Sequence, residues 1–242
     1  GLSGLSGTVN GKAVTLTDNA DNTYSGTYTI AEGDTDRAAN ALPISFTLAD
    51  AAGNTVAVSA FTSTTPAIDC NKPTGSVTAL APNSGTSKVG NTVTLTVTAG
   101  NSETGLTLAG TINSKAGTNV VEVGGGVYTI DYVVAEGDND VTSGNLACSL
   151  TLTDAAGNVS VAISSIPANT LAIDCHSPTV STVVANPAAG TRKVGDSITV
   201  TVTASEAGLS GLSGTVNAKA VTLTDNADNT YSGTYTIAEG DT

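Results

Sequence analysis

The chain has 242 residues, of which 8 are basic and 21 are acidic, giving a formal net charge of −13. Nucleic-acid-binding proteins need clustered Lys and Arg, so this charge argues against that class and makes cations the more natural partners. Aromatic residues are only 3% of the sequence and Trp and Met are absent, so the core must come from Val, Leu, Ile and Ala, which favours short strands over helices. The sequence has no apolar run long enough to span a membrane and no signal-peptide pattern, so neither is predicted within these residues.

The chain repeats itself. Residues 1–35 return as residues 208–242 with one change, Gly11 to Ala218. Shorter motifs recur at about half this offset: AIDC at Ala67 and Ala172, AEGD at Ala31, Ala135 and Ala238, and DAAGN at Asp50 and Asp154. The spacing predicts a tandem array of modules of about 104 residues in two alternating variants. We expect a partial module at 1–69, a complete module at 70–174 and a partial module at 175–242.

Alternation of apolar residues with Thr predicts the strands of the complete module. Val93, Leu95 and Val97 alternate with Thr along one such strand, as expected for an antiparallel strand that is buried on one face. In chain order, strands are predicted at 75–80, 88–99, 106–113, 120–123, 127–134, 146–152 and 159–163. Seven short strands separated by Gly, Pro, Asn and Asp turns indicate an immunoglobulin-like Greek-key β-sandwich. By the same pattern, residues 1–69 are expected to form the third to the seventh strand of a module. Residues 175–242 are expected to form the first five strands of another.

Four motifs occur in a fixed order at a fixed spacing. They are the Lys-Val-Gly lead into a Thr-rich strand (Lys88 and Lys193), the tyrosine strand that ends in AEGD, the LTDAAGN turn, and an IDxxxP junction. Together they resemble the bacterial immunoglobulin-like repeats of large surface adhesins. The resemblance covers essentially the whole chain. It implies tandem sandwiches arranged as a rod, in a secreted protein at the cell surface that is often stiffened by calcium and acts mainly as a stalk.

Acidic residues concentrate at the predicted ends of the modules. The strand order gathers Glu32, Asp34, Asp36, Asp69, Glu103 and Asp154 at the first junction, and Glu136, Asp138, Asp140, Asp174 and Glu206 at the second. Ca²⁺ takes six to eight oxygen ligands, and carboxylates packed together without a cation would repel one another. The sequence therefore predicts Ca²⁺ at the junctions, with solvated acidic loops as the alternative. A further cluster at Asp18 and Asp21, repeated at Asp225 and Asp228, fits ordinary turn residues better than a metal site.

The chain has three cysteines and one histidine. Cys70 and Cys175 occupy equivalent positions about one module apart, so they cannot reach each other. Cys148 is either a small buried hydrophobe or a disulfide partner of Cys175 across the module end. His176 lies beside a junction, where too few ligands are at hand for zinc. Because the sequence has no second His to act as a base and no G-x-S-x-G motif, enzyme activity is not expected.

These observations favour a structural role. The main hypothesis is a set of stalk repeats of a bacterial surface adhesin, whose partners are the neighbouring repeats of the same chain. The alternative is a subunit or segment of a self-assembling extracellular fibre, in which other copies complete the partial modules. Ligand binding by the modules themselves is less favoured, because exposed aromatic anchors are nearly absent.

Overall fold

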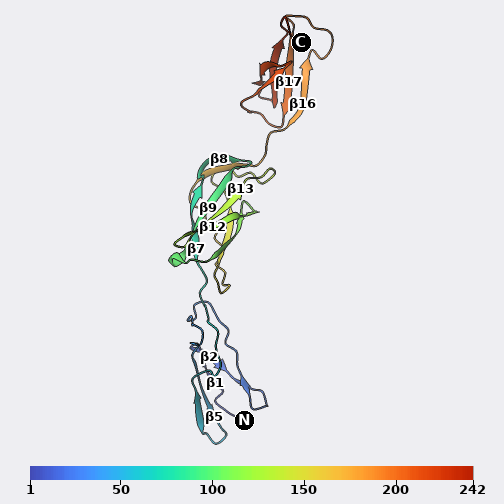
Figure 1. Ribbon diagram of the computed structural model, residues 1–242. Coiled ribbons are helices and arrows are strands. Elements are labelled where there is room, and N and C mark those ends of the chain that lie inside the picture. The colour runs from blue at the N-terminus through green and yellow to red at the C-terminus, as the bar shows by residue number, and fades with distance from the viewer. Residues whose placement is uncertain (242) are drawn as a thin grey trace. The chain divides into compact units, whose positions relative to one another are not determined.

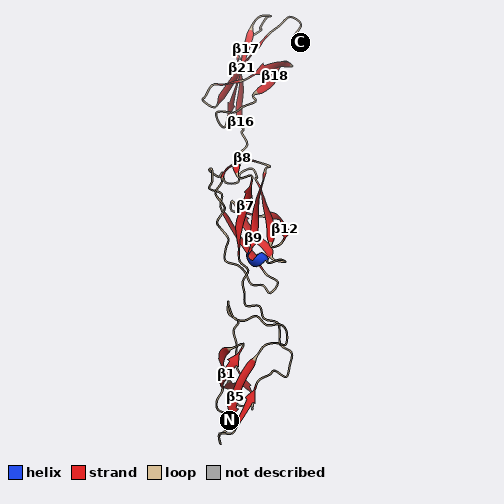
Figure 2. Ribbon diagram, turned by 90° about the vertical axis from the view of Figure 1, so that its left-hand side faces the viewer, coloured by secondary structure: helices blue, strands red, loops and turns tan. Residues whose placement is uncertain are grey.

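The computed structural model describes residues 1–241. Within them, strands form sheets that are antiparallel except for one two-stranded parallel pair, and the one helical element is a three-residue 3-10 turn, η1 (Gly100–Ser102) (Figures 1 and 2). The all-β prediction is confirmed. The chain forms two compact units, one of residues 1–135 and 139–174, the other of residues 136–138 and 175–241. Among the described residues there is no helix with the length and apolar character needed to cross a membrane.

The first 69 residues of the first unit form one four-stranded sheet and a small hairpin. The sheet has the order β2-β1-β5-β6. Its strands are β1 (Ser6–Val9), β2 (Lys12–Thr15), β5 (Ile44–Ala49) and β6 (Thr55–Val58), and the hairpin is β3 (Thr17–Asp18) with β4 (Tyr24–Ser25). The two-residue turn between β1 and β2 is Asn10-Gly11, and both residues have positive φ, at 51° and 77°. This backbone matches the right-handed twist of the two strands that the turn joins.

The remainder of the first unit is a sandwich of two sheets, β12-β13-β9-β7 and β11-β10-β14, with a separate parallel pair, β15-β8. The strands are β7 (Gly75–Ala81), β8 (Ser84–Lys88), β9 (Thr92–Ala99), β10 (Thr107–Ile112), β11 (Lys115–Ala116), β12 (Thr118–Gly124), β13 (Val127–Val133), β14 (Cys148–Thr153) and β15 (Thr170–Asp174). Val93, Leu95 and Val97 of β9 are 0% exposed, and so are Leu150 and Leu152 of β14. The alternating pattern therefore identifies the core residues of both sheets correctly.

Two predicted strands differ from the observed ones. The strand predicted at 88–99 is shortened to β9, which begins at Thr92, because the backbone turns at Gly90, whose φ is +87°; β8, which ends at Lys88, was not predicted. The strand predicted at 159–163 is reduced to isolated bridges, Thr153 with Val159 and Leu150 with Ile163. Between these bridges, the Leu152 N–H donates to the Ser160 side-chain oxygen at 3.0 Å, so a hydroxyl replaces a backbone partner. The extended chain resumes only at β15, which no pattern in the sequence predicted.

The second unit has one complete sheet and one hairpin. The sheet order is β16-β17-β21-β20, and the hairpin is β18-β19. The strands are β16 (Val180–Asn186), β17 (Ser197–Ala204), β18 (Ser213–Val216), β19 (Lys219–Thr222), β20 (Thr224–Asp225) and β21 (Thr230–Thr236). β17 follows β9 at an offset of 105 residues, and its apolar face is only half-buried.

The cysteines are buried side chains. Cys148 is a free thiol whose Sγ donates to the carbonyl of Ile163 at 3.6 Å, and burial raises the pKa of that thiol. The bridge suggested between Cys148 and Cys175 is therefore not formed, because the Cys148 side chain points into the sandwich. Cys70 is also a free thiol and is 3% exposed.

Candidate metal centre

Asp34, one of the predicted metal ligands, has a different set of partners in the structure. Its carboxylate lies 2.6 Å from the ammonium nitrogen of Lys12 and accepts hydrogen bonds from the Tyr28 hydroxyl at 2.8 Å and the Ala31 N–H at 3.1 Å. The Asp34 side chain is 3% exposed. The hydrogen bonds from Lys12 and Tyr28 lower the pKa of this carboxyl, so it is ionised and already neutralised by an ammonium group. Asp34 thus anchors its own loop.

The same network recurs in the second unit. Asp241 lies 3.1 Å from the Lys219 ammonium group and accepts hydrogen bonds from the Tyr235 hydroxyl at 2.7 Å and the Ala238 N–H at 2.9 Å. The hydrogen bonds from Ala238, Tyr235 and Lys219 lower the pKa of Asp241 to about 2.

A turn asparagine contacts the tyrosine of each copy. Asn10 donates to the Tyr28 hydroxyl at 3.0 Å, and Asn217 donates to that of Tyr235 at 3.1 Å. In the middle of the chain, Asn113 donates to the Tyr132 hydroxyl at 3.2 Å. We call the Lys, Asp, Tyr and Asn set of residues 10–34, and its copy in residues 217–241, the latch network. Sequence repetition is therefore matched by repetition of these side-chain contacts.

Three predicted ligands gather around the segment 69–72. The Asp36 carboxylate accepts from the Cys70 N–H and from the Asn71 side-chain amide, both at 2.8 Å. The Asn71 N–H donates to the Asp69 carboxylate at 3.1 Å. The Lys72 N–H donates to the Glu32 carboxylate at 3.2 Å. These contacts fix the carboxylates of Glu32, Asp36 and Asp69 beside the chain that leads into β7.

The DAAGN turn brings Asp154 to the same junction. Its carboxylate accepts from the N–H groups of Ala156 and Asn158 and from the Asn158 side-chain amide, each at 2.9 Å. Burial alone would raise the pKa of Asp154, but these hydrogen bonds outweigh it and lower the pKa. The Asn158 amide also lies 3.5 Å from the carbonyl oxygen of Asp69 and 3.4 Å from that of Asn71. The turn and the segment 69–72 are therefore in contact.

Glu103 completes this cluster. Burial raises its pKa, and the charges of Asp154 and Asp69 raise it further. Partial burial and neighbouring like charges both disfavour the ionised form of a carboxyl group. The first-junction cluster therefore consists of Asp69, Glu103 and Asp154, with the Asp69 and Asn71 carbonyls beside them.

The donor set of this cluster consists of carboxylate and carbonyl oxygens, the ligands that Ca²⁺ prefers. The three carboxylates fit a Ca²⁺ site only in part. Within residues 1–241, their oxygen atoms do not all lie within 4.8 Å of one another.

The predicted residues of the second junction are divided between the two units. In the first unit, Val141 and Ile173 exchange backbone hydrogen bonds of 2.9 Å, which sets Asp140 beside Asp174, and carboxylate oxygens of these two lie within 4.8 Å. In the second unit, the Glu136 carboxylate accepts from the Ser177 N–H at 3.1 Å, and hydrogen bonds from the side chain and the N–H of Ser177 lower its pKa. Two other predicted ligands lie in that unit: Asp138, which is 7% exposed, and Glu206, whose backbone carbonyl accepts from the Tyr231 hydroxyl at 2.9 Å.

Several contributors were not identified from the sequence. The Asn158 side chain and the carbonyl of Asn71 supply polar atoms to the first-junction cluster. Lys12 and Tyr28 bind the carboxylate of Asp34. The sequence repeat could have indicated the latch network, since Lys, Tyr and Asp keep the same spacing in residues 12–34 and 219–241.

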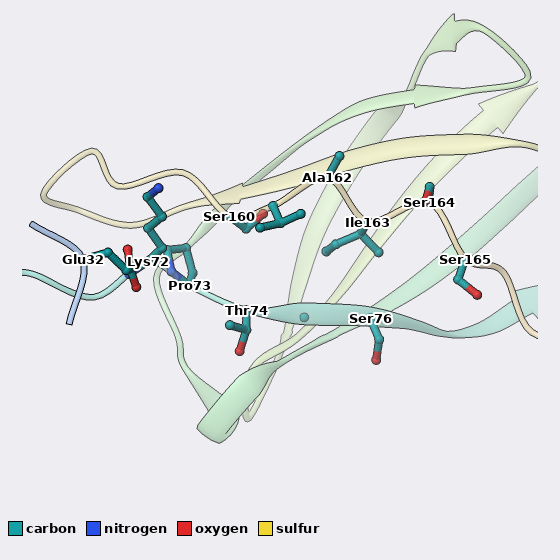
Figure 3. A pocket seen from close by; sticks show the side chains of 12 residues that line it. Glu32, Lys72, Pro73, Thr74, Ser76, Ser160, Ala162, Ile163, Ser164 and Ser165 are labelled. Atoms are coloured by element: carbon teal, nitrogen blue, oxygen red, sulfur yellow. The ribbon is translucent and has the colours of Figure 1, made fainter.

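A groove of about 600 Å³ lies beside this cluster, between the start of β7 and residues 160–165 (Figure 3). Its lining is mostly Ser, Thr, Val and Ile, with Glu32 and Lys72 at one end. The serines Ser76, Ser160 and Ser164 lie along it, and none of its lining residues is a histidine that could act as their base.

No protein-family model and no curated protein sequence matches the chain. Among solved structures, the chain is similar to one described as "Ca2+-stabilized adhesin helps an Antarctic bacterium reach out and bind ice", with 22% sequence identity and a TM-score of 0.35. The match covers 96% of this chain and 56% of that chain, so this chain spans little more than half of the matched one. A TM-score of this size does not establish a common fold.

Proposed function

We propose that these residues are stalk repeats of a secreted bacterial surface adhesin, built from immunoglobulin-like Greek-key modules. The observation that carries the proposal is the latch network, which is built from the same residue types in residues 10–34 and 217–241. A module that recurs with its own internal contacts can be added or removed as a unit, because each copy stabilises itself and its neighbours only. Length is the property that such an array provides. The chain is proposed to have no enzymatic role.

Calcium is the proposed partner of the junction acids. At the first junction it would be held by Asp69, Glu103 and Asp154, together with the carbonyls of Asp69 and Asn71. Asp140 and Asp174 are a second pair with the same chemistry. Burial, and after it the charges of Asp154 and Asp69, raises the pKa of Glu103; a divalent cation would offset the charge repulsion, so binding would stabilise the junction.

Thermal unfolding with and without calcium tests the stalk proposal. At a Ca²⁺ concentration 100 times the dissociation constant, a single site stabilises the folded chain by about 2.7 kcal/mol, so the melting temperature rises and EGTA reverses the rise. Glu103→Gln should reduce the calcium-dependent rise, whereas Glu122→Gln, an exposed match on β12, should leave it intact. A melting temperature that is the same in Ca²⁺ and in EGTA would remove calcium from the proposal.

The stalk itself is tested by length. Small-angle scattering on chains with increasing numbers of the 207-residue repeat should show a maximum dimension that increases by a constant step for each repeat. A maximum dimension that stays constant as repeats are added would contradict a stalk.

A further inference from the structure

The turn between β1 and β2 contains the one Asn-Gly pair of the sequence, Asn10-Gly11. Asn-Gly suits a two-residue hairpin turn in which both residues have positive φ. The same pair is chemically fragile, because glycine has no Cβ to keep its backbone nitrogen away from the side-chain amide of the asparagine before it. The turn therefore combines a favourable conformation with a reactive pair of residues.

The other copies of this turn have a side chain after the asparagine. They are Asn113-Ser114, between β10 and β11, and Asn217-Ala218, between β18 and β19. The exchange of Gly11 for Ala218 is also the one difference between residues 1–35 and residues 208–242. A Cβ at Gly11 would meet no atom within 4 Å, so neighbouring groups do not require a glycine there. The exchange therefore changes the backbone and the reactivity of the asparagine, and not the packing.

The fold holds the Asn10 amide through all of its polar atoms. Its nitrogen donates to the Tyr28 hydroxyl at 3.0 Å and to the Thr35 carbonyl at 2.8 Å, and its oxygen accepts from the Arg37 guanidinium at 2.7 Å. The residue is 4% exposed. Loss of the amide nitrogen requires attack on the carbon between these two atoms, so the hydrogen bonds must first break. The folded turn should therefore protect Asn10.

The complete sandwich in the middle of the chain holds its turn asparagine in the same way. Asn113 is 7% exposed and donates to the Tyr132 hydroxyl at 3.2 Å and to the Asn139 carbonyl at 2.8 Å. A buried amide with a tyrosine and a carbonyl as acceptors is therefore a property of the module fold.

We propose that Asn10 is a modification site, at which the amide is lost to water when the β1-β2 turn opens. The backbone nitrogen of Gly11 attacks the side-chain carbonyl carbon of Asn10 and gives its proton to solvent. Ammonia leaves, and a five-membered succinimide ring remains. Water then opens the ring at either carbonyl, which gives aspartate or isoaspartate. Water is the only co-reactant, and the inference does not depend on the proposed function.

The product cannot restore the latch network. A carboxylate has no N–H group, so both hydrogen bonds that the Asn10 amide donates are lost, and a carboxylate oxygen would face the carbonyl oxygen of Thr35. The Tyr28 hydroxyl already donates to Asp34 at 2.8 Å, so a second carboxylate would lie near the first. Each reaction would therefore leave a permanent mark of an opening of the turn.

Peptide mass spectrometry tests both the reaction and its protection by the fold. Trypsin releases residues 1–12 and 194–219, which each contain a single asparagine, Asn10 and Asn217. The whole chain is incubated in mildly alkaline buffer with and without urea. Because only the open turn reacts, we expect conversion of Asn10 to be at least about tenfold slower in the folded chain than in urea. Equal rates in the two conditions would overturn the protection by the fold.

Exchange of the two turn residues tests the role of glycine. In urea, Asn10 should convert several-fold faster than Asn217. Gly11→Ala should slow conversion at Asn10 to the rate of Asn217, and Ala218→Gly should raise Asn217 to the rate of Asn10. Equal conversion of Asn10 and Asn217 in the unfolded wild-type chain would contradict the proposal.

Removal of one acceptor tests the latch network directly. Tyr28→Phe deletes the hydroxyl that binds the Asn10 amide, so conversion in the folded chain should be several-fold faster, with no change in urea. Tyr24→Phe is the matched control, because the Tyr24 hydroxyl accepts from the Leu2 N–H at 3.0 Å. Circular dichroism establishes that both variants are folded. Conversion of folded Tyr28→Phe at the wild-type rate would contradict protection by this network.

The effect of the product is tested with Asn10→Asp. This variant should have a lower melting temperature than the wild type. Asn22→Asp, at an exposed turn position with a φ of 67°, should melt as the wild type does. A melting temperature of Asn10→Asp equal to that of the wild type would show that the carboxylate is accommodated, and would overturn the opening of the latch network.

Discussion

The ammonium nitrogen of Lys12 lies 2.6 Å from the carboxylate of Asp34, in a contact that leaves the Asp34 side chain 3% exposed. An equivalent pair, Lys219 and Asp241, recurs 207 residues later. In both copies the lysine comes from a strand next to the hairpin turn, and the aspartate from the loop that follows the tyrosine strand. The pair therefore ties together two segments that are separated in sequence, and it holds the AEGD loop against the hairpin.

Removal of the turn asparagine should loosen this network. Asn10 is 4% exposed, and its side chain contacts the Tyr28 hydroxyl, the Thr35 carbonyl and the Arg37 guanidinium at 3.0, 2.8 and 2.7 Å. Asn10→Ala removes all three hydrogen bonds, although the Tyr28 hydroxyl keeps its bond to Asp34, so we expect a loss of about 2 kcal/mol in the unfolding free energy. Urea unfolding followed by amide NMR signals of residues 1–69 measures it.

Asn22→Ala is the matched control for that substitution. Asn22 is exposed and has a φ of 67°, so this variant carries a similar backbone strain without the buried contacts. Its loss should stay below about 1 kcal/mol. Equal losses at the two positions would show that the turn conformation, and not the network, determines stability.

The one difference between the two repeat copies has a predictable effect. Gly11 has a φ of 77°, and its counterpart Ala218 has a φ of 60°, a region in which a Cβ is strained. Ala218→Gly should stabilise the second unit by about 1 kcal/mol, and Gly11→Ala should destabilise residues 1–69 by a similar amount. A Cβ at Gly11 would meet no atom within 4 Å, so crowding does not complicate the comparison. Thermal melts of both variants should shift in opposite directions; shifts of the same sign would contradict this account.

Equivalent valines on β9 and β17 should differ in importance. Val97 is 0% exposed, and Val97→Ala should cost about 2 to 3 kcal/mol through lost burial and a cavity. Val202→Ala on β17 should cost less than half of that in dilute solution, because its side chain is half-buried. Chemical denaturation of the two variants at low protein concentration compares them directly. A similar loss at both sites would mean that the face of β17 is already covered.

Acid should weaken the second unit through Asp241. The pKa of this carboxyl is about 2 in the folded chain, against an ordinary value of 3.8. A lowered pKa stabilises the folded state fully above about 3.8, and that contribution is lost as the pH falls through about 2. Asp241→Asn should therefore be less stable than wild type at pH 6, with the difference shrinking from pH 4 to pH 2. A difference that is independent of pH would assign the effect to packing.

Residue periodicity accounts for most of what the sequence could predict. β9, β13 and β14 alternate strictly between core and surface, so their burial follows from local pattern alone. The parallel pairing of β15 with β8 joins residues more than 80 positions apart and has no local signature. Residues 159–163 have the sequence pattern of a strand. In the structure, however, the Leu152 N–H donates to the Ser160 hydroxyl oxygen and not to a backbone carbonyl.

The acids show the same limit. Asp34 and Asp36 are two residues apart in a loop, where alternation does not define direction. The structure buries Asp34 against Lys12 and turns Asp36 toward the segment 69–72. The sequence predicted that both residues lie at the junction. It contains no local pattern that shows which of the two carboxylates a lysine from another strand neutralises.

The pairing of β15 with β8 also bears on force. β15 is the last strand before the chain leaves the first unit, and it runs parallel to β8 in a register from Thr170 opposite Ser84 to Asp174 opposite Lys88. Tension applied along β15 would load these hydrogen bonds together, in shear, and not one after another as in unzipping. A strand held in this way resists extraction until several bonds break at once, which is the mechanical property that a load-bearing tether requires.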